Sequence, residues 1–293
     1  GLSTIAEIAD QNGNFTILLD ALTRTDLAET MADPSQTLTV FAPSDDAFVD
    51  LLAELGLDDL DAVEDALGTD GLKNVLLYHV LGAVVTSDMV STGYVSSLGT
   101  NATMDPLSFY TNTESGVLIN DRAMVTTANV TASNGVIHII DKVILPLSIY
   151  DLLNLNPDYA TLTAALGIAD GDLDELLSDE ISGPFTLVAP DEAAFANLLT
   201  ELMLPDVPAL VDALGTDGLA SVLTYHVISG NYNSNELPSG DVPTVNGDSI
   251  TIDQTDGVVI TDTQDRTSEV TAVDIQGTNG VIHTFNTVIL PNL

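Results

Sequence analysis

The sequence predicts an α+β protein built from two like domains in tandem, residues 1–147 and 148–293. Its 293 residues are enough for two ordinary hydrophobic cores, since domains usually run to about 100–200 residues. Short motifs recur in the same order about 145 residues apart, which is the mark of a repeated unit. Within each copy, helical periodicity gives way to strand-like segments, so helices and a sheet are expected in each domain.

Four pairs of segments carry the repeat. Their order is the same in both halves and their spacing drifts by only a few residues, which indicates duplication of one unit. Only Leu147 separates the last motif of the first copy from the first helix of the second, so we expect a short join. The pairs are Ser3–Leu22 with Ser148–Leu166, "TVFAPSDDAF" at Thr39 with "LVAPDEAAF" at Leu187, "NGVIH" at Asn134 and at Asn279, and "VILP" at Val143 and at Val288.

A strand that runs into a helix is expected in the second pair. "LTVFAP" alternates and then breaks at Pro43, and the next residues carry side-chain oxygens. Such oxygens accept hydrogen bonds from the free N–H groups of a first helical turn. We therefore expect Ser44 or Asp45 to cap the helix in the first copy and Asp191 to cap it in the second.

Short helices and then strands are expected in the rest of each copy. The stretch from Ala47 to Leu81 has apolar residues at helical spacing, with Gly56, Gly68 and Gly71 as punctuation. After Gly82 the segments are rich in Thr, Val and Ser, with Asn and Gly at the turns. This composition is typical of strands, which we expect to end with "GVIHIIDKVILP".

The charge balance narrows the choice of partners. Forty-four Asp and Glu residues against five Lys and Arg give a net charge of −39. A field of that sign repels nucleic acid and anionic membranes, whereas divalent cations and basic surfaces remain suitable partners. Molar salt shortens the Debye length to about 3 Å and screens the self-repulsion. We therefore expect a protein from a saline habitat, of the halophilic or marine type.

Two further classes are disfavoured by composition. The chain has no cysteine, which excludes disulfides, thiolate metal sites and thiol catalysis. The most apolar short run, Val75–Val85, is well short of the about 20 residues that cross a bilayer. We therefore expect no transmembrane segment.

The ordered motifs resemble a known family. "TVFAPSDDAF", "YH" and "NGVIHIIDKVILP", in this order in each half, are similar to the first signature block, the Tyr-His motif and the second signature block of the fasciclin (FAS1) domain. The resemblance covers essentially the whole chain twice. It implies two tandem fasciclin-like domains, each a wedge-like β-sandwich of about seven strands with several flanking helices. It also implies secreted or cell-surface proteins of adhesion, matrix and biofilm, most of which are not enzymes.

The second copy departs from the pattern at three positions. Glu192 stands where the first copy has Asp45, and Asn286 and Thr287 replace Asp141 and Lys142. The sequence leaves open whether the second copy keeps a polar contact made through that aspartate. The last strand is expected to persist, because the apolar alternation is kept at Ile282, Val288 and Leu290.

All four histidines fall in duplicated motifs. His79 lies at i+7 from Leu72 on an apolar helical stripe, and His226 repeats this geometry. The expected role is a buried imidazole bonded to backbone or a carboxylate. Two alternatives stay open: adhesion, because the Tyr-His region of eukaryotic relatives is associated with integrin binding, and a zinc site of paired histidines with a carboxylate. The candidate motif residues are Tyr78, His79, Tyr225, His226, His138, His283 and Asp45.

Other patterns give weaker expectations. The acidic run Asp170–Glu180 fails the EF-hand template, because Glu175 holds the position that needs Gly. Three Asn-X-Thr triplets are candidate glycosylation sites, at Asn14, Asn101 and Asn129. No serine-nucleophile elbow, His-Glu-x-x-His motif or phosphate loop is present, so we expect no catalytic, cofactor or metal site.

These observations favour an extracellular or cell-surface, non-enzymatic adhesion or matrix protein. Its expected partners are a protein, a glycan or copies of itself, as in a surface layer or fibre, with cations bridging acidic faces. The alternative is a soluble carrier of an apolar small molecule such as a carotenoid, because some acidic, water-soluble fasciclin proteins resemble this chain.

Overall fold

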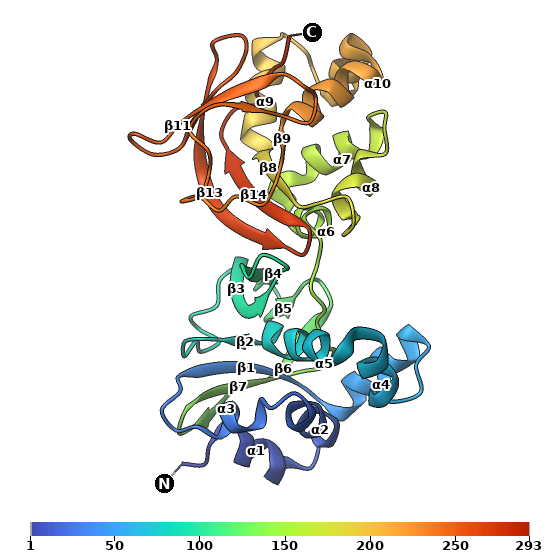
Figure 1. Cartoon of the computed structure of the whole chain (residues 1–293), viewed down its shortest axis with the longest axis vertical. Coiled ribbons are helices and arrows are strands. Elements are labelled where there is room, and N and C mark those ends of the chain that lie inside the picture. The colour runs from blue at the N-terminus through green and yellow to red at the C-terminus, as the bar shows by residue number, and fades with distance from the viewer. Residues whose placement is uncertain (1, 293) are drawn as a thin grey trace. The chain divides into compact units, whose positions relative to one another are not determined.

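The computed structural model describes residues 2–292, which form two compact units divided between Pro146 and Leu147. The division lies one residue before the boundary expected from the repeat. Within the described residues, each unit runs through a helical segment, one strand, two helices and six more strands. Figure 1 shows this succession in the second unit, from the helices around α6 to the strands that end with β14.

The first unit contains five helices and seven strands among its described residues. The helices are α1 (Ile5–Asn12), α2 (Thr16–Arg24), α3 (Ala28–Ala32), α4 (Asp45–Leu55) and α5 (Leu60–Tyr78). The strands are β1 (Leu38–Pro43), β2 (Val80–Leu81), β3 (Gly93–Thr100), β4 (Pro106–Asn112), β5 (Leu118–Ile119), β6 (Ala123–Ala132) and β7 (Gly135–Ile140).

The second unit repeats this order and adds a short 3-10 helix. Its helices are α6 (Ile149–Leu155), η1 (Pro157–Tyr159), α7 (Ala160–Ile168), α8 (Leu173–Ser178), α9 (Glu192–Glu201) and α10 (Val207–Tyr225). Its strands are β8 (Phe185–Pro190), β9 (Val227–Ser229), β10 (Gly240–Pro243), β11 (Ser249–Asp253), β12 (Val259–Thr261), β13 (Thr267–Gly277) and β14 (Gly280–Phe285).

Side-chain caps set where several helices begin. Ser44 caps α4 by accepting from the N–H of Ala47, so the first of the two expected residues is the cap. Asp191 caps α9 as expected. Each cap satisfies an N–H group that has no partner inside the helix.

The long helices α5 and α10 are each bent at one glycine. Gly68 and Gly215 have φ of 73° and 72°, a left-handed conformation that interrupts the helix and that glycine adopts without a steric penalty. Gly71, expected as a third break, lies inside the second half of α5 and does not interrupt it. The difference arises because only a positive φ, not glycine as such, breaks the helical hydrogen bonds.

By length and composition, α10 could cross a membrane, and among the described residues it alone meets that criterion. The bend at Gly215 divides it into two shorter helices. Leu219, Val222 and Leu223 on its second half are buried in the domain core. The second half of α10 is therefore part of the domain core.

The seven strands of each unit form one hydrogen-bonded sheet. Its order in the first unit is β2-β1-β7-β6-β5-β4-β3. Strand β1 pairs in parallel with β7, from Leu38 opposite Gly135 to Pro43 opposite Ile140. In the second unit, β8 pairs with β14 in the same way. The parallel pair thus joins the two signature blocks, which lie far apart in the sequence.

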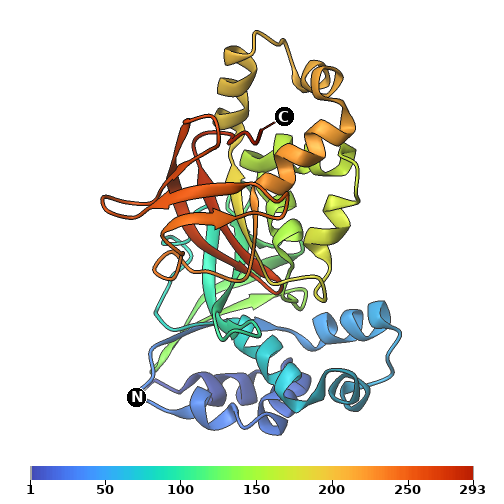
Figure 2. The same cartoon turned by 45° about the horizontal axis from the view of Figure 1, so that its top comes forward.

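The sheet folds over on itself. Register shifts interrupt the pairing of β6 with β7, as expected of bulges that bend a strand. As a result Phe41 on β1 packs edge-on against Phe109 on β4, with ring centroids 5.7 Å apart. These two rings belong to one hydrophobic core of the domain. Another core, between the sheet and the helices, includes Phe15, Phe48 and Leu76. In the second unit, strands gather on one side and helices on the other (Figure 2). The predicted α+β fold of seven strands with flanking helices is confirmed.

The last strand is shorter than expected. Strands β7 and β14 end at Ile140 and Phe285, so both "VILP" segments lie outside the sheet. The last strand of the second copy therefore persists as expected, as β14, but Val288 and Leu290 lie beyond its end rather than within it. These side chains face the helices, and other groups hold the backbone of the segment in place, as described below.

A tight approach at the start of β14 gives a stability prediction. A Cβ added at Gly280 would lie 2.2 Å from the carbonyl oxygen of Phe185 on the parallel partner strand. Gly280→Ala is expected to destabilise the second domain by about 1–3 kcal/mol or more, because the strands must separate. Denaturant unfolding followed by circular dichroism measures the change.

The matched control is Gly167→Ala in α7. A Cβ there meets nothing within 4 Å, and alanine favours the helix, so this variant should be neutral or slightly more stable. Equal stability of the two variants would contradict the parallel pairing.

Candidate functional site

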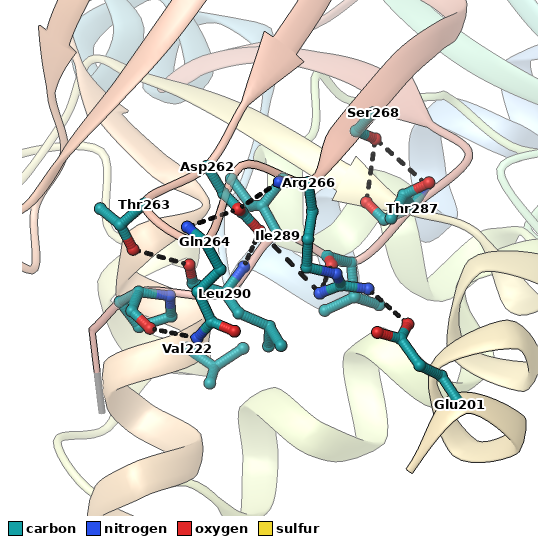
Figure 3. A network of polar contacts seen from close by, with 12 residues as sticks. Glu201, Val222, Asp262, Thr263, Gln264, Arg266, Ser268, Thr287, Ile289 and Leu290 are labelled. Atoms are coloured by element: carbon teal, nitrogen blue, oxygen red, sulfur yellow. Dashed lines mark hydrogen bonds and ion pairs between the residues drawn. The ribbon is translucent and has the colours of Figure 1, made fainter.

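The Tyr-His motif of the second domain ends α10 and faces the "VILP" segment. His226 is 1% exposed. Its Nδ1 lies 2.7 Å from the carbonyl oxygen of Val222, and its Nε2 accepts a hydrogen bond of 3.2 Å from the N–H of Ile289 (Figure 3). An acceptor at Nε2 requires the proton on Nδ1. The neutral ring therefore joins the helix end to the segment after the last strand.

His79 makes the same pair of contacts in the first domain. Its Nδ1 lies 2.7 Å from the carbonyl oxygen of Val75, and its Nε2 accepts from the N–H of Ile144 at 3.1 Å. A segment that lacks sheet partners is thus held by a side chain. This satisfies a buried N–H group that would otherwise be unpaired.

The preceding tyrosines fix the other face of the site. Tyr78 and Tyr225 are fully buried. The hydroxyl of Tyr78 donates to the carbonyl of Ser108 at 2.8 Å and accepts from Asn120 at 3.1 Å. In the second domain the hydroxyl of Tyr225 donates to the carbonyl of Ser249 at 3.0 Å. Burial raises the pKa of both phenols, so they stay protonated.

A buried aspartate extends the network in the second domain. Asp262 is 6% exposed and accepts three backbone hydrogen bonds of 2.9 Å, from Gln264, Arg266 and Leu290 (Figure 3). Arg266 in turn donates to the carbonyl of Val288 at 2.9 Å and to Glu201 on α9 at 2.8 Å. Consecutive residues of the "VILP" segment are therefore held by polar side chains: Val288 by Arg266, Ile289 by His226, and Leu290 by Asp262 and by the hydroxyl of Thr263.

The first domain keeps the arginine of this network. Arg122 donates to the carbonyl of Val143 at 3.0 Å and pairs with Glu54 on α4. The role of Asp262 is not repeated by Asn120, which accepts from the N–H of Tyr110 at 2.8 Å and donates to the hydroxyl of Tyr78. Sequence reasoning missed these residues. Their signal was the recurrence of an arginine directly before the last two strands of each copy, with a glutamate near the end of the helix that follows the first signature block.

The second histidine pair tethers a bulge in the long strand. His138 lies 2.8 Å from the carbonyl oxygen of Val85 through Nε2, and its Nδ1 accepts from the N–H of Asn129 at 3.3 Å. His283 makes the equivalent contacts with Tyr232 and Asp274. Both rings are 1% exposed. The donor is Nε2 here, the opposite tautomer from the Tyr-His pair.

The asparagine of the "NGVIH" motif connects the helical layer to the strands through hydrogen bonds. Asn134 accepts from the N–H of Ile5 at 2.9 Å and donates to the carbonyls of Met31 and Asp33. Asn279 makes the matching contacts in the second domain, with Ile149, Leu177 and Asp179. The motif was recognised in the sequence, but this role of its first residue was not.

The departures in the second copy are compensated. Asp45 accepts from the N–H of Ile17 and the hydroxyl of Thr16. Glu192 accepts from the N–H and hydroxyl of Thr161, so the second copy keeps this polar contact, which the sequence had left open. The longer side chain reaches the same backbone position.

The second substitution keeps its contact as well. Asp141 accepts from the N–H of Met124 at 2.8 Å, and Asn286 accepts from the N–H of Glu269 at 2.9 Å. An amide oxygen is sufficient for one backbone donor. The ion pair of Lys142 with Asp50, 2.5 Å between the charged atoms, belongs to the first domain.

Burial determines the protonation of the four imidazoles. Desolvation lowers the pKa of His79 and His226 to about 4 and also lowers the pKa of His138 and His283. At neutral pH all four rings are neutral, and both nitrogens of each are engaged. A metal ion would have to displace a backbone N–H from the ring lone pair. Among residues 2–292 no group of three or more metal-ligating side chains is found.

The candidate glycosylation sites differ in their surroundings. Asn14 is exposed between α1 and α2. Asn129 is also exposed, but its Nδ2 donates to Ser87 at 2.8 Å. The side-chain oxygen of Asn101 accepts from the N–H groups of Thr103 and Asp105 within a turn.

These features define a class of tandem α+β domains. Each domain has a folded seven-stranded sheet, a helical layer and a histidine that binds the segment after the last strand. The residues of the duplicated motifs do not form a catalytic arrangement. The fasciclin domain profile matches residues 13–146 and 157–291. The chain belongs to the fasciclin domain family.

Known proteins similar to this chain come from animals and bacteria. Transforming growth factor-beta-induced protein ig-h3 of Sus scrofa is 29% identical over 270 residues, which is 87% of this chain and 35% of that protein. Human periostin is 29% identical over 264 residues, 87% of this chain and 28% of periostin. Protein sll1483 of Synechocystis is 39% identical over 146 residues, 49% of this chain and 73% of that protein. The chain thus spans about a third of the length of the animal relatives.

A solved structure has the same fold. The FAS1 domain pair from the insect cell adhesion molecule Fasciclin I aligns over 97% of this chain and 95% of its own, with a TM-score of 0.52 and 18% identity.

The buried histidines predict a loss of stability in weak acid. Their folded pKa lies below the ordinary value of 6.5, so the unfolded chain binds protons first and stability is lost as pH falls from 6.5 towards about 4. With one histidine at this pKa in each domain, the free energy of unfolding of each domain should fall by about 1.4 kcal/mol per pH unit near the middle of that window. Denaturant titrations in molar salt, which screens carboxylate repulsion, measure the slope. A flat or rising profile would contradict neutral burial.

The hydrogen bonds of Asp262 predict that its substitution destabilises the second domain more than substitution of an exposed aspartate does. Asp262→Asn would place an amide N–H₂ against one of three backbone donors, so we expect a loss of about 1–3 kcal/mol in the second domain. Asp253→Asn is the control, because the exposed Asp253 accepts through Oδ1 alone, from Thr255. This variant should change stability by less than about 0.5 kcal/mol. Equal, small effects at both sites would show that Asp262 is not required as a triple acceptor.

Proposed function

We propose that this chain is an extracellular, non-enzymatic adhesion or matrix protein that acts through contacts with protein, glycan or further copies of itself. The observation that carries the proposal is that both halves belong to the fasciclin family, in which adhesion and matrix roles are expected. The similar insect domain pair comes from a molecule described as a cell adhesion molecule.

The use of the motif side chains supports a role without catalysis. The two tyrosines and four histidines make hydrogen bonds to backbone inside each domain. A general base or a metal ligand needs an accessible lone pair, which these rings do not offer in the folded chain. Contacts with partners are therefore expected to be made by exposed residues and not by the buried Tyr-His motif.

The charge distribution indicates how such contacts would form. Four of the five basic side chains make ion pairs within their own domain, namely Arg24, Arg122, Lys142 and Arg266. Most of the 44 acidic residues are therefore left without a cationic side chain. Like-charged faces repel, so approach of two copies requires screening or cations between them. We infer that self-association depends on divalent cations.

Beads coated with the chain test the adhesion proposal. In molar salt with calcium, they are expected to cluster with one another or to bind a neutral-glycan array, and chelation of calcium should reverse the clustering. Beads coated with an acidic protein of another fold are the control for charge alone. Dispersed beads with no bound protein or glycan under these conditions would contradict the proposal.

Salt is also expected to stabilise the fold. With −39 charges, screening at molar salt removes repulsion within the compact state, so the melting temperature should rise from low to molar sodium chloride. Differential scanning calorimetry measures the shift. A melting temperature that does not rise would remove the halophilic interpretation.

The carotenoid-carrier alternative has no specific observation in its favour. Three apolar cavities have volumes of about 20, 30 and 210 Å³. A cavity of about 150 Å³ holds benzene, whereas a carotenoid is many times longer than one ring. These spaces suit only a much smaller guest.

A further inference from the structure

The two domains differ in the interior of their helical layers. In the second domain, α9, α10 and the "VILP" segment surround an apolar cavity of about 210 Å³. At the matching place in the first domain, α4, α5 and the equivalent segment surround one of about 30 Å³. Ten apolar side chains and one amide, that of Gln264, line the larger cavity. One copy of a duplicated unit has thus opened a space that the other has filled.

The shared lining does not account for the difference. Phe48 and Leu51 in the first domain match Phe195 and Leu198 in the second, and four lining residues of the second half of the long helix or next to its bend match as well, namely Leu67, Leu72, Val75 and Leu76 with Leu214, Leu219, Val222 and Leu223. One lining position differs, because Leu210 replaces the smaller Val63, and this change would narrow the cavity of the second domain. These lining residues are therefore no smaller in the second domain, although its cavity is seven times larger. The cause lies in what packs against them.

One cause is a substitution on the preceding helix. Ile17 on α2 lines the small cavity of the first domain. Thr161 takes its place on α7, and its hydroxyl donates to Glu192 at 2.9 Å. The shorter, polar side chain is held by the carboxylate and does not line the larger cavity.

A second cause is the loss of a charged clamp. Arg24 at the end of α2 binds Asp20 on its own helix and Asp61 and Glu64 on α5, which ties the two helices together. The matching residues of the second domain are Ile168, Ala164, Pro208 and Val211, so no such ion pairs form there. An apolar side chain, Ile168, stands in place of the arginine and is 47% exposed, and Leu202 in the cavity lining is 42% exposed.

The size and chemistry of the cavity define its guest. A dry cavity of about 150 Å³ accommodates benzene, so about 210 Å³ suits a substituted single ring or a short branched chain. No charged side chain lines it, and burying a charge there would be costly. The field of −39 charges further disfavours anionic guests such as fatty acids.

We propose that the second domain binds a small, neutral, apolar molecule of the size of a monocyclic aromatic in the cavity between α9, α10 and residues 288–290, and that the first domain does not. This site is separate from the proposed adhesion contacts, and either can hold without the other. Binding brings apolar atoms into contact with the apolar lining of the cavity, and it stabilises the second domain by mass action.

Toluene is a suitable probe for the full chain. Titration followed by NMR of leucine and valine methyl groups should give saturable shifts at Leu198, Leu219 and Val222, with the matching methyls of the first domain unchanged. The melting transition of the second domain should rise with toluene concentration. Absence of saturable binding, or equal binding by both domains, would overturn the proposal.

Two variants locate the site. Leu202→Phe adds a ring at the half-exposed rim, and Thr161→Ile restores the isoleucine of the first domain. Each is expected to weaken toluene binding by about tenfold or more, equivalent to about 1.4 kcal/mol. Leu55→Phe, at the matching rim position of the first domain and 48% exposed, should leave it unchanged. Unchanged affinity in both folded second-domain variants would place toluene elsewhere and refute the assignment.

Discussion

The parallel pairing of β1 with β7, repeated by β8 with β14, is the contact on which each domain depends. It joins strands from opposite ends of the copy, so the sheet closes only when most of the domain is in place. When this pair has formed, the "VILP" segment that follows the last strand lies next to the end of the long helix. There His79 or His226 can accept its backbone N–H.

The polar residues of the signature motifs serve the backbone. Histidines, tyrosines and the asparagine of "NGVIH" each satisfy N–H or carbonyl groups that neither helix nor sheet can pair. Buried polar groups without partners destabilise a fold, which explains why such side chains occur in an otherwise apolar interior. The same engagement leaves them unable to bind a metal or to take up a proton near neutral pH.

The two copies have diverged unevenly. Where a side chain accepts a hydrogen bond from a backbone N–H, the second copy keeps that bond with a different residue type. Glu192 does this in place of Asp45, and Asn286 does it in place of Asp141. Where helices pack on one another, contacts are simply lost, as with the clamp of Arg24. The loss of a solvent-facing ion pair has only a small effect on stability. Contacts between the helices can therefore be replaced more easily than the hydrogen bonds that hold the backbone of the sheet. New binding properties are therefore expected in the helical layer.

The sequence alone determined the duplication, the α+β class, the helix cap at Asp191 and the family resemblance, because these depend on local patterns and their order. It narrowed the other cap to Ser44 or Asp45, and it located His79 and His226 on an apolar helical face. Their hydrogen-bond partners, the roles of Asp262, Arg266 and Asn134, the end of the last strand at Phe285 and the enlarged cavity were decided only by the tertiary structure. The physical reason is that each depends on groups brought together from distant parts of a domain, whose geometry no local pattern encodes.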